Sequence, residues 1–220
     1  MPTPTTNTEL LSLGGWTFRA RASQAPAPRL LVLLHGWTGD ENSMWIFAKR
    51  LSPAYWMIAP RAPHAAEPGG FSWRDMKNAA FGWPTLESLS PAANGLLQLI
   101  DNYAASIGVD ATQFDVMGFS QGAAMVNLMG MLHPNRIRKM AALAGFVPPG
   151  VEELVHKKPL TGKRVFVAHG TQDQMIPLDR AHASLALLEQ AGAHVTYYED
   201  QVGHKMGAAG MRALEEYMNG

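Results

Sequence analysis

The sequence predicts an α/β fold in which a mostly parallel, twisted sheet carries helices on both faces. Short continuous apolar runs, such as Leu30-Leu31-Val32-Leu33-Leu34, are typical of strands that are buried on both faces. Stretches with helical spacing of apolar residues lie between these runs along the whole chain, which is the alternation that builds parallel sheets. The length of 220 residues predicts one domain over residues 1–220, without room for a large cap domain.

The expected strands follow a loose lead-in over residues 1–9. The run at Leu30 is bounded by Pro28 and Gly36, and the run at Tyr55 is stopped by Pro60. Proline and glycine mark such ends because they interrupt regular backbone structure. The predicted strands are residues 14–22, 30–34, 55–59, 114–117, 140–144, 165–169 and 195–198.

The expected helices occupy the intervals between the strands. Asp40 and Ser43 are candidates for the N-cap of a helix that ends at Leu51. Met125 and Met129 recur at helical spacing, which favours packing against the sheet over any role in binding a cofactor. The remaining predicted helices are residues 90–107, 121–132, 178–190 and 206–218.

Composition excludes several classes of function. Eighteen Lys and Arg residues balance eighteen Asp and Glu residues, and no basic block suggests nucleic acid or an anionic membrane as a partner. The chain has no cysteine, hence no thiolate nucleophile and no Cys-rich zinc site, and no convincing ligand cluster predicts another metal. No run approaches the roughly 20 apolar residues that span a bilayer, and the polar start does not read as a secretory signal. We expect a cytoplasmic protein without a cofactor.

The pentapeptide Gly118-Phe119-Ser120-Gln121-Gly122 is the most informative motif. It follows a predicted strand and opens a predicted helix, which is the context of a nucleophile elbow rather than of a chance glycine-rich turn. Such a turn exposes a serine hydroxyl above the carboxyl edge of the sheet, beside the N-terminus of a helix. The motif predicts acyl-transfer chemistry with Ser120 as the nucleophile.

A serine nucleophile needs a base, which in this fold class follows the acid in the chain. His204 comes after the last predicted strand, in Val202-Gly203-His204-Lys205, where a loop lets the ring reach the elbow. His182 falls inside a predicted helix and His194 begins a strand. His204 is therefore the expected base, and a solvated loop histidine is the alternative.

The acid should lie on a loop between the serine and the histidine. Asp173 follows the strand that ends at His169, and its carboxylate would orient the imidazole and stabilise the imidazolium. Asp200 is the second choice, whereas Asp179 suits the first turn of a helix on electrostatic grounds alone. Glu199 is a further competitor, and His169 is expected to be structural.

The oxyanion of an acyl-transfer intermediate requires backbone donors from two loops. Gly36 follows the strand at Leu34 and allows close approach of the backbone to a substrate. The N–H groups of Trp37 and Gln121 are the expected donors. An ordinary glycine turn after a strand is the alternative.

Residues 60–84 form an unusual glycine-rich loop with several aromatic side chains. This composition fits the wall of an apolar substrate cleft, and a satellite cluster packed under a long loop fits it equally well. The candidate substrate-binding residues are Phe71, Trp73, Phe81 and Trp83.

Together these motifs resemble the α/β-hydrolase superfamily and, more closely, the phospholipase/carboxylesterase family of bacterial carboxylesterases and acyl-protein thioesterases. The likeness runs from Leu31 to Tyr217 and rests on five motifs in order: Leu34-His35-Gly36-Trp37-Thr38-Gly39-Asp40, Phe71-Ser72-Trp73, Gly118-Phe119-Ser120-Gln121-Gly122-Ala123, His169-Gly170-Thr171-Gln172-Asp173 with Ile176-Pro177, and Gly203-His204. The resemblance implies a triad of Ser120, Asp173 and His204, oxyanion donors at Trp37 and Gln121, no cofactor, and allows a homodimer.

The expected function is hydrolysis of small carboxylic esters. The family usually has a smaller residue where this chain has Trp37, and an indole there should narrow the acyl pocket and favour short chains. A thioesterase acting on acylated proteins or acyl-CoA, or a lysophospholipase, would use the same residues. A serine peptidase and a ligand-binding protein on a hydrolase scaffold are further alternatives.

Overall fold

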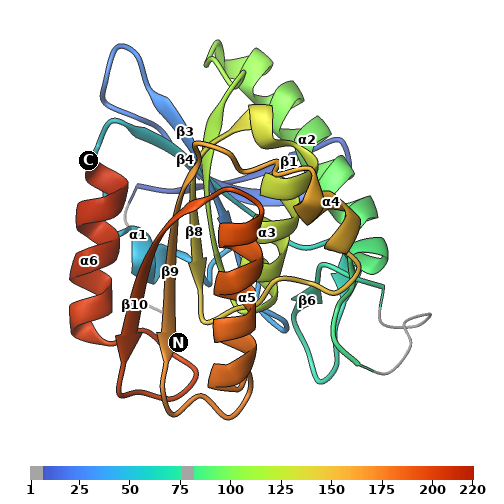
Figure 1. Cartoon of the computed structure of the whole chain (residues 1–220). Helices are drawn as coiled ribbons and strands as arrows, with labels where there is room; N and C mark the ends of the chain where they lie inside the picture. The colour runs from blue at the N-terminus through green and yellow to red at the C-terminus, as the bar shows by residue number, and fades with distance from the viewer. Residues whose placement is uncertain (1–6, 76–81) are drawn as a thin grey trace.

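A computed structural model describes residues 7–75 and 82–220, and a twisted, mostly parallel sheet lies at its centre (Figure 1). Within the described residues this sheet has eight strands, in the order β1-β2-β4-β3-β7-β8-β9-β10. β1 and β2 are antiparallel to each other, β2 is antiparallel to β4, and the remaining neighbours are parallel. The strands are β1 (Glu9–Leu13), β2 (Trp16–Arg21), β3 (Arg29–Leu34), β4 (Tyr55–Pro60), β7 (Phe114–Phe119), β8 (Ile137–Leu143), β9 (Arg164–Gly170) and β10 (His194–Asp200).

Helices cover both faces of the sheet, as the sequence predicts. Figure 1 shows α1 and α6 on one side of the sheet and α2, α3, α4 and α5 on the other. The helices are α1 (Trp45–Ala48), α2 (Leu86–Ile107), α3 (Gln121–Leu132), α4 (Glu152–His156), α5 (Leu178–Gln190) and α6 (Ala208–Asn219), with a 3₁₀ turn η1 at Pro134–Arg136. In the described part of the chain, no helix combines the length and hydropathy that crossing a bilayer requires.

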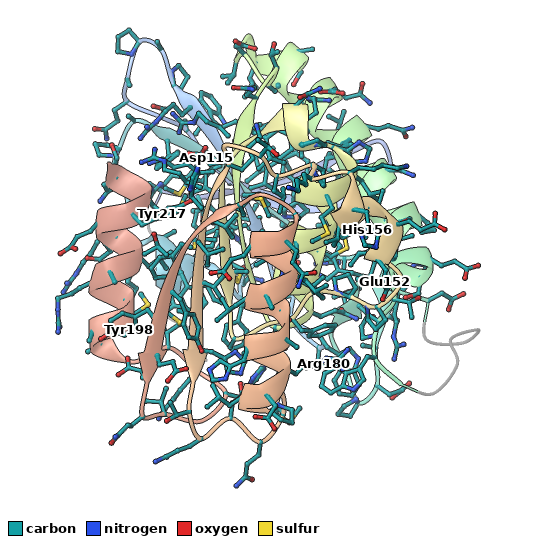
Figure 2. All side chains as sticks on the ribbon, in the orientation of Figure 1. Asp115, Glu152, His156, Arg180, Tyr198 and Tyr217 are labelled. Atoms are coloured by element: carbon teal, nitrogen blue, oxygen red, sulfur yellow. The ribbon has the colours of Figure 1, made fainter. Side chains whose placement is uncertain are left out.

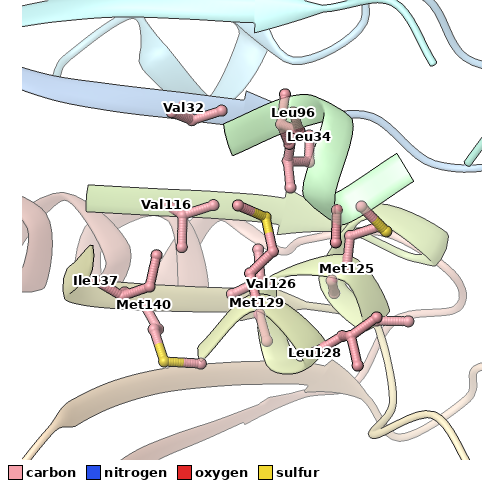
Figure 3. Packing of buried hydrophobic residues seen from close by; sticks show 14 of the residues in the cluster. Val32, Leu34, Leu96, Val116, Met125, Val126, Leu128, Met129, Ile137 and Met140 are labelled. Carbon is pink, nitrogen blue, oxygen red and sulfur yellow. The ribbon is translucent and has the colours of Figure 1, made fainter. Parts of the chain in front are cut away.

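The alternation of side chains along β3 explains why its sequence is continuously apolar. Leu30, Val32 and Leu34 pack in a core cluster with residues of α2 to α5, and Figure 3 shows part of this cluster around α3. Leu31 and Leu33 point to the opposite face, into a cluster with residues of α1 and α6. A strand in the middle of a three-layer fold therefore has no face on which a polar side chain is favoured.

The boundaries of several elements differ from those that the sequence predicts. The lead-in ends earlier than expected, because Glu9 already begins β1, which pairs along its whole length with β2. α2 starts at Leu86, before the expected residue 90, because Thr85 and Ser88 form a capping box. Oγ1 of Thr85 accepts from the Ser88 N–H, and Oγ of Ser88 accepts from the Thr85 N–H. α4 (Glu152–His156) is a helix that the sequence analysis does not anticipate.

The parallel strands direct their connections to one edge of the sheet. The loops that follow β3, β7, β8, β9 and β10 all leave from the carboxyl ends of the strands, where open α/β sheets bind their ligands. Ser120, Asp173 and His204 follow β7, β9 and β10 in turn. The topology thus brings three distant parts of the sequence to one edge.

Candidate active site

Ser120 occupies a strained turn between β7 and α3. Its backbone has φ 55° and ψ −117°, a left-handed conformation that is unfavourable for residues other than glycine. The neighbouring glycines make the turn possible: a Cβ on Gly118 would lie 2.2 Å from the carbonyl oxygen of Gly122, and one on Gly122 would lie 2.1 Å from that of Leu34. The Ser120 N–H donates to the Leu143 carbonyl at 2.9 Å, so the turn is fixed to β8.

A chain of hydrogen bonds joins the three predicted catalytic side chains. Nδ1 of His204 lies 2.7 Å from Oδ2 of Asp173, and Nε2 of His204 lies 3.0 Å from Oγ of Ser120. An ionised carboxylate only accepts hydrogen bonds, so Nδ1 carries the proton and Nε2 accepts from the serine hydroxyl. This is the tautomer that a general base requires for removing the hydroxyl proton.

The carboxylate of Asp173 is fixed from both of its oxygens. Its Oδ1 accepts hydrogen bonds of 2.9 Å from the backbone N–H groups of Met175 and Ile176, while Oδ2 faces His204. The Asp173 side chain has no exposed surface, whereas that of His204 is 20% exposed. The acid is thus held rigidly in the interior, and the imidazole remains at the edge where a substrate can reach it.

A second histidine contacts the same carboxylate. Nε2 of His169 lies 2.8 Å from the Ile176 carbonyl oxygen and 3.5 Å from Oδ2 of Asp173, and its side chain is completely buried. The ring therefore fastens the end of β9 to the turn that carries Asp173. This placement agrees with the structural role that the sequence predicts for His169.

The competing acids and bases lie in other surroundings. His182 and Glu199 pair with each other at 2.7 Å on the exposed surface. Asp200 accepts a 3.4 Å hydrogen bond from the Gly210 N–H at the start of α6, and Asp179 is an acid in the first turn of α5. His194 begins β10, at the end of the strand opposite to the loop that carries His204.

The loop after β3 packs directly against the nucleophile turn. A Cβ on Gly36 would lie 3.2 Å from Cβ of Ser120, closer than most such contacts, so glycine suits this close approach of the two backbones. Trp37 comes next, with a side chain that is 44% exposed. Trp37 follows Gly36 in the loop that packs against Ser120, and Gln121 directly follows Ser120 in the chain. The role of their backbone N–H groups as oxyanion donors stays a prediction.

His35 holds this loop in place as a neutral imidazole. Its Nδ1–H donates to the Gly36 carbonyl at 2.7 Å, and its Nε2 accepts from the Ala62 N–H at 3.0 Å. Burial lowers the pKa of His35, because desolvation disfavours the charged ring. A protonated ring would also lose the acceptor that Ala62 uses. No role for His35 is predicted from the sequence, although its position directly before Gly36 is a signal.

The side chain of Gln121 links α3 to the aromatic loop. Its Oε1 accepts from the Trp73 N–H at 3.0 Å, and its Nε2 donates to Oγ of Ser72 at 3.1 Å. From the sequence, a role is predicted only for the backbone of Gln121. A polar residue at the first position of a helix is ordinarily exposed, so the sequence gives no signal for this contact.

The described part of the loop at 60–84, up to residue 75, is tied to the loop after β3. It contains a short hairpin of β5 (His64–Ala65) and β6 (Phe71–Ser72). Thr38 donates to the Phe71 carbonyl, and Phe71 donates to the Gly39 carbonyl, at 3.0 and 2.9 Å. The loop therefore forms one unit with the segment that carries Trp37.

The aromatic residues of this loop divide into buried and accessible ones. Trp73 has no exposed surface, and its indole N–H donates to the His35 carbonyl at 2.8 Å, so packing rather than substrate contact explains this residue. Phe71 is partly buried under the Arg61 guanidinium, at 4.6 Å, and Trp83 is 38% exposed. Phe81 lies outside the described residues. Phe71 and Trp83 stay candidates for substrate contact.

Comparisons with known proteins place the chain in a family. Residues 17–220 match the sequence pattern described as Phospholipase/Carboxylesterase. Acyl-protein thioesterase 1 of Yarrowia lipolytica is 31% identical over 170 residues, which cover 68% of this chain and 71% of that protein. Carboxylesterase SOBER1 of Arabidopsis thaliana is 26% identical over 181 residues, which cover 78% of each chain.

A solved structure shows the same fold over nearly the entire length. The carboxylesterase from Mesorhizobium loti superposes with a TM-score of 0.81 at 23% identity, covering 97% of this chain and 99% of that one. The fold class and the resemblance that the sequence motifs predict are both confirmed. The chain belongs to the Phospholipase/Carboxylesterase family of α/β-hydrolases.

Proposed function

We propose that this protein is a serine hydrolase that cleaves small, short-chain carboxylic esters through an acyl-enzyme on Ser120. The observation that carries the proposal is the continuous hydrogen-bond chain from Asp173 through His204 to Ser120. Family membership supports the reaction class, because its curated relatives include a carboxylesterase and an acyl-protein thioesterase.

The geometry suits a two-step acyl transfer. Oγ of Ser120 attacks the acyl carbon while its proton passes to Nε2 of His204, and the buried Asp173 carboxylate stabilises the imidazolium. The negative charge on the former carbonyl oxygen is bound by the N–H groups of Trp37 and Gln121, at the N-terminus of α3. The intermediate collapses and the alcohol leaves with the proton from His204. Water then loses a proton to the same nitrogen and attacks the acyl-enzyme. The second intermediate collapses as this proton returns from Nε2 to Oγ of Ser120, which breaks the bond to the acyl group and releases the acid.

Ser120→Ala tests the assignment. Removal of the attacking oxygen should lower kcat on a p-nitrophenyl ester by about 10⁶-fold, as expected for loss of a triad serine. Ser106→Ala is a matched control, because Ser106 is a solvent-facing residue of α2 whose hydroxyl bonds only the Tyr103 carbonyl among the described residues. Wild-type rates in purified Ser120→Ala would refute the assignment.

Preference for short acyl chains follows from the indole of Trp37 beside the nucleophile turn. A p-nitrophenyl series from acetate to laurate should give the highest kcat/KM at the short end, and Trp37→Ala should move the maximum toward longer chains. A wild-type maximum at ten or more carbons would contradict this reading.

Thioester hydrolysis is the second candidate, favoured by the similarity to acyl-protein thioesterase 1 of Yarrowia lipolytica. The same three side chains would act on a thioester, so a panel of matched oxygen esters, thioesters and lysophospholipids separates these activities. A cytoplasmic location and a homodimer stay predictions, which cell fractionation and light scattering would test.

A further inference from the structure

Arg180, in the first turn of α5, is held against two aromatic rings. Its guanidinium carbon lies 4.2 Å from the ring centre of Trp83 and 4.9 Å from that of Phe146. These two rings meet edge to face at a centroid distance of 5.0 Å. A guanidinium stacked in this way keeps its N–H groups free around its rim, in the fork that matches a carboxylate.

The pair of rings, Trp83 and Phe146, lies at the edge of the sheet that carries the nucleophile. Phe146 follows β8, directly after Gly145, and a Cβ on Gly145 would lie 3.1 Å from the carbonyl oxygen of Ser120. The Phe146 carbonyl accepts a 3.0 Å hydrogen bond from Nδ2 of Asn127, which belongs to the helix that begins after Ser120. Figure 2 shows Arg180 at the end of α5 toward which β9 and β10 run. Arg180 is therefore a neighbour of the catalytic edge rather than of the outer surface.

The charge of Arg180 is not balanced within the described residues. No carboxylate of those residues lies within ion-pair distance of it, although other arginines pair closely with Glu41, Asp101 or Asp115. Its Nε is buried and has no hydrogen-bond partner there. Burial lowers the pKa of Arg180, and no carboxylate acts in the opposite direction. A guanidinium without an acceptor is costly, and Arg180 is only partly buried, so a carboxylate that reaches the terminal N–H groups at its rim would be bound favourably.

Arg74 adds a second cation close to the residue that precedes Trp83. It donates from Nη2 to the Gly82 carbonyl at 2.8 Å, directly before Trp83, and its own Nε is likewise buried without a partner among the described residues. Two guanidinium groups thus flank the segment at Gly82 and Trp83. Their combined field favours an anion over a neutral group at this place.

We propose that Arg180, supported by Trp83 and Phe146, is a specificity-determining residue that binds a carboxylate carried by the substrate, so that the preferred esters are anionic. The inference rests on the proposed esterase function and narrows its substrate class. The carboxylate sits either on the acid part or on the alcohol part of the ester. Neutral short-chain esters would remain substrates without this contact.

Two matched pairs of substrates test the proposal. Monoethyl glutarate is compared with the ethyl ester of glutaric acid monoamide for the acid part, and 4-acetoxybenzoate with 4-acetoxybenzamide for the alcohol part. The measured quantity is the ratio of kcat/KM for the anionic ester to that for the neutral ester. The wild type should favour the anionic ester of one pair, and R180Q should lower that ratio by about 10- to 100-fold, the range expected for a hydrogen bond to a charged group.

The controls separate this contact from general electrostatics and from misfolding. R212Q removes the same charge from the exposed face of α6 and should leave the ratio unchanged. R180K keeps the charge but loses the planar fork, so its ratio should fall between those of the wild type and R180Q, and it carries the test if R180Q does not fold.

Each outcome bears on a different statement. Turnover of any member of the two pairs tests the proposed function alone, and its absence with both the anionic and the neutral esters would refute esterase activity. A wild-type enzyme that hydrolyses neutral esters without preferring the anionic member of either pair would overturn the role of Arg180. An undiminished ratio in R180Q would do the same, and would leave Arg180 as a residue that only holds Trp83.

Discussion

Replacing Asp115 with asparagine should cost far more stability than replacing Asp101 with asparagine, although an arginine binds each carboxylate through two nitrogens. Asp115, in β7, has no exposed side-chain surface, and it accepts from Nε and Nη2 of Arg138 and lies 2.7 Å from the Tyr55 hydroxyl. The Asp101 side chain is 53% exposed and accepts from two nitrogens of Arg136. The two sites share chemistry and differ in burial.

The magnitude follows from that difference. Asp115→Asn leaves Arg138 and the buried Tyr55 hydroxyl without their charged partner, and because the Arg138 side chain is 35% exposed and partly solvated, the cost falls below that of a fully buried pair, at about 2–4 kcal/mol. An exposed pair contributes about 0–1 kcal/mol, because water replaces the lost partner. For a chain of this size, each kcal/mol lowers Tm by about 2–4 °C. Asp115→Asn should therefore lower Tm by about 4–16 °C, and Asp101→Asn by less than about 4 °C.

Urea unfolding followed by circular dichroism measures both free energies. The slope against urea should match the wild type in both variants, because the surface exposed on unfolding is unchanged. Asp115 lies toward the amino end of β7 and Ser120 just beyond its carboxyl end, so folded Asp115→Asn should keep its esterase activity at low temperature. Equal costs at the two sites would refute the reasoning from burial.

Three further predictions concern the catalytic edge. Because burial lowers the pKa of His35, the unfolded chain binds more protons than the folded chain near pH 6.5. The free energy of unfolding should fall as pH drops from about 7 to 5, and less steeply in His35→Gln, with His133 supplying part of the remaining slope because its pKa is also lowered. Gly122→Ala should cost about 1–3 kcal/mol and abolish activity by forcing α3 away from β3, whereas Gly69→Ala, with open space around the new Cβ, should be neutral in urea unfolding and ester assays. Ser120→Gly should be inactive yet about 1 kcal/mol more stable than Ser120→Ala in the same unfolding assay, because glycine relieves the positive φ.

The nucleophile turn is predictable from sequence because its constraints are local. Gly118 and Gly122 are required by atoms within a few residues or in the adjoining strand, and the order of serine, acid and histidine restricts the other two positions. The strand cores are predictable for a similar reason. A strand buried on both faces, such as β3, is a short, continuous run of apolar residues, and few other elements require such a run. The structure brings Ser120, Asp173 and His204 into hydrogen-bond contact.

Features that depend on long-range packing are not predictable in this way. β1 alternates weakly and has an exposed face, so its sequence resembles that of a loop. Nothing local distinguishes the buried Trp73 from the partly exposed Trp83, because neither belongs to a periodic element. The start of α2 is hard to predict because proline usually lies in the first turn of a helix, which favours a start near Pro91. In the structure, Pro91 lies one turn further into the helix.

The amide of Gln121 has a consequence for protein engineering. Its side chain makes hydrogen bonds to Oγ of Ser72 and to the N–H of Trp73. A loop of another length or sequence would not automatically retain these two bonds. If a relative's loop is grafted onto this scaffold to alter selectivity, the buried Gln121 amide loses its hydrogen-bond partners unless the new loop supplies a hydroxyl and a main-chain N–H in the same places. Libraries that diversify residues 60–84 should therefore keep these anchor points fixed and randomise the positions between them.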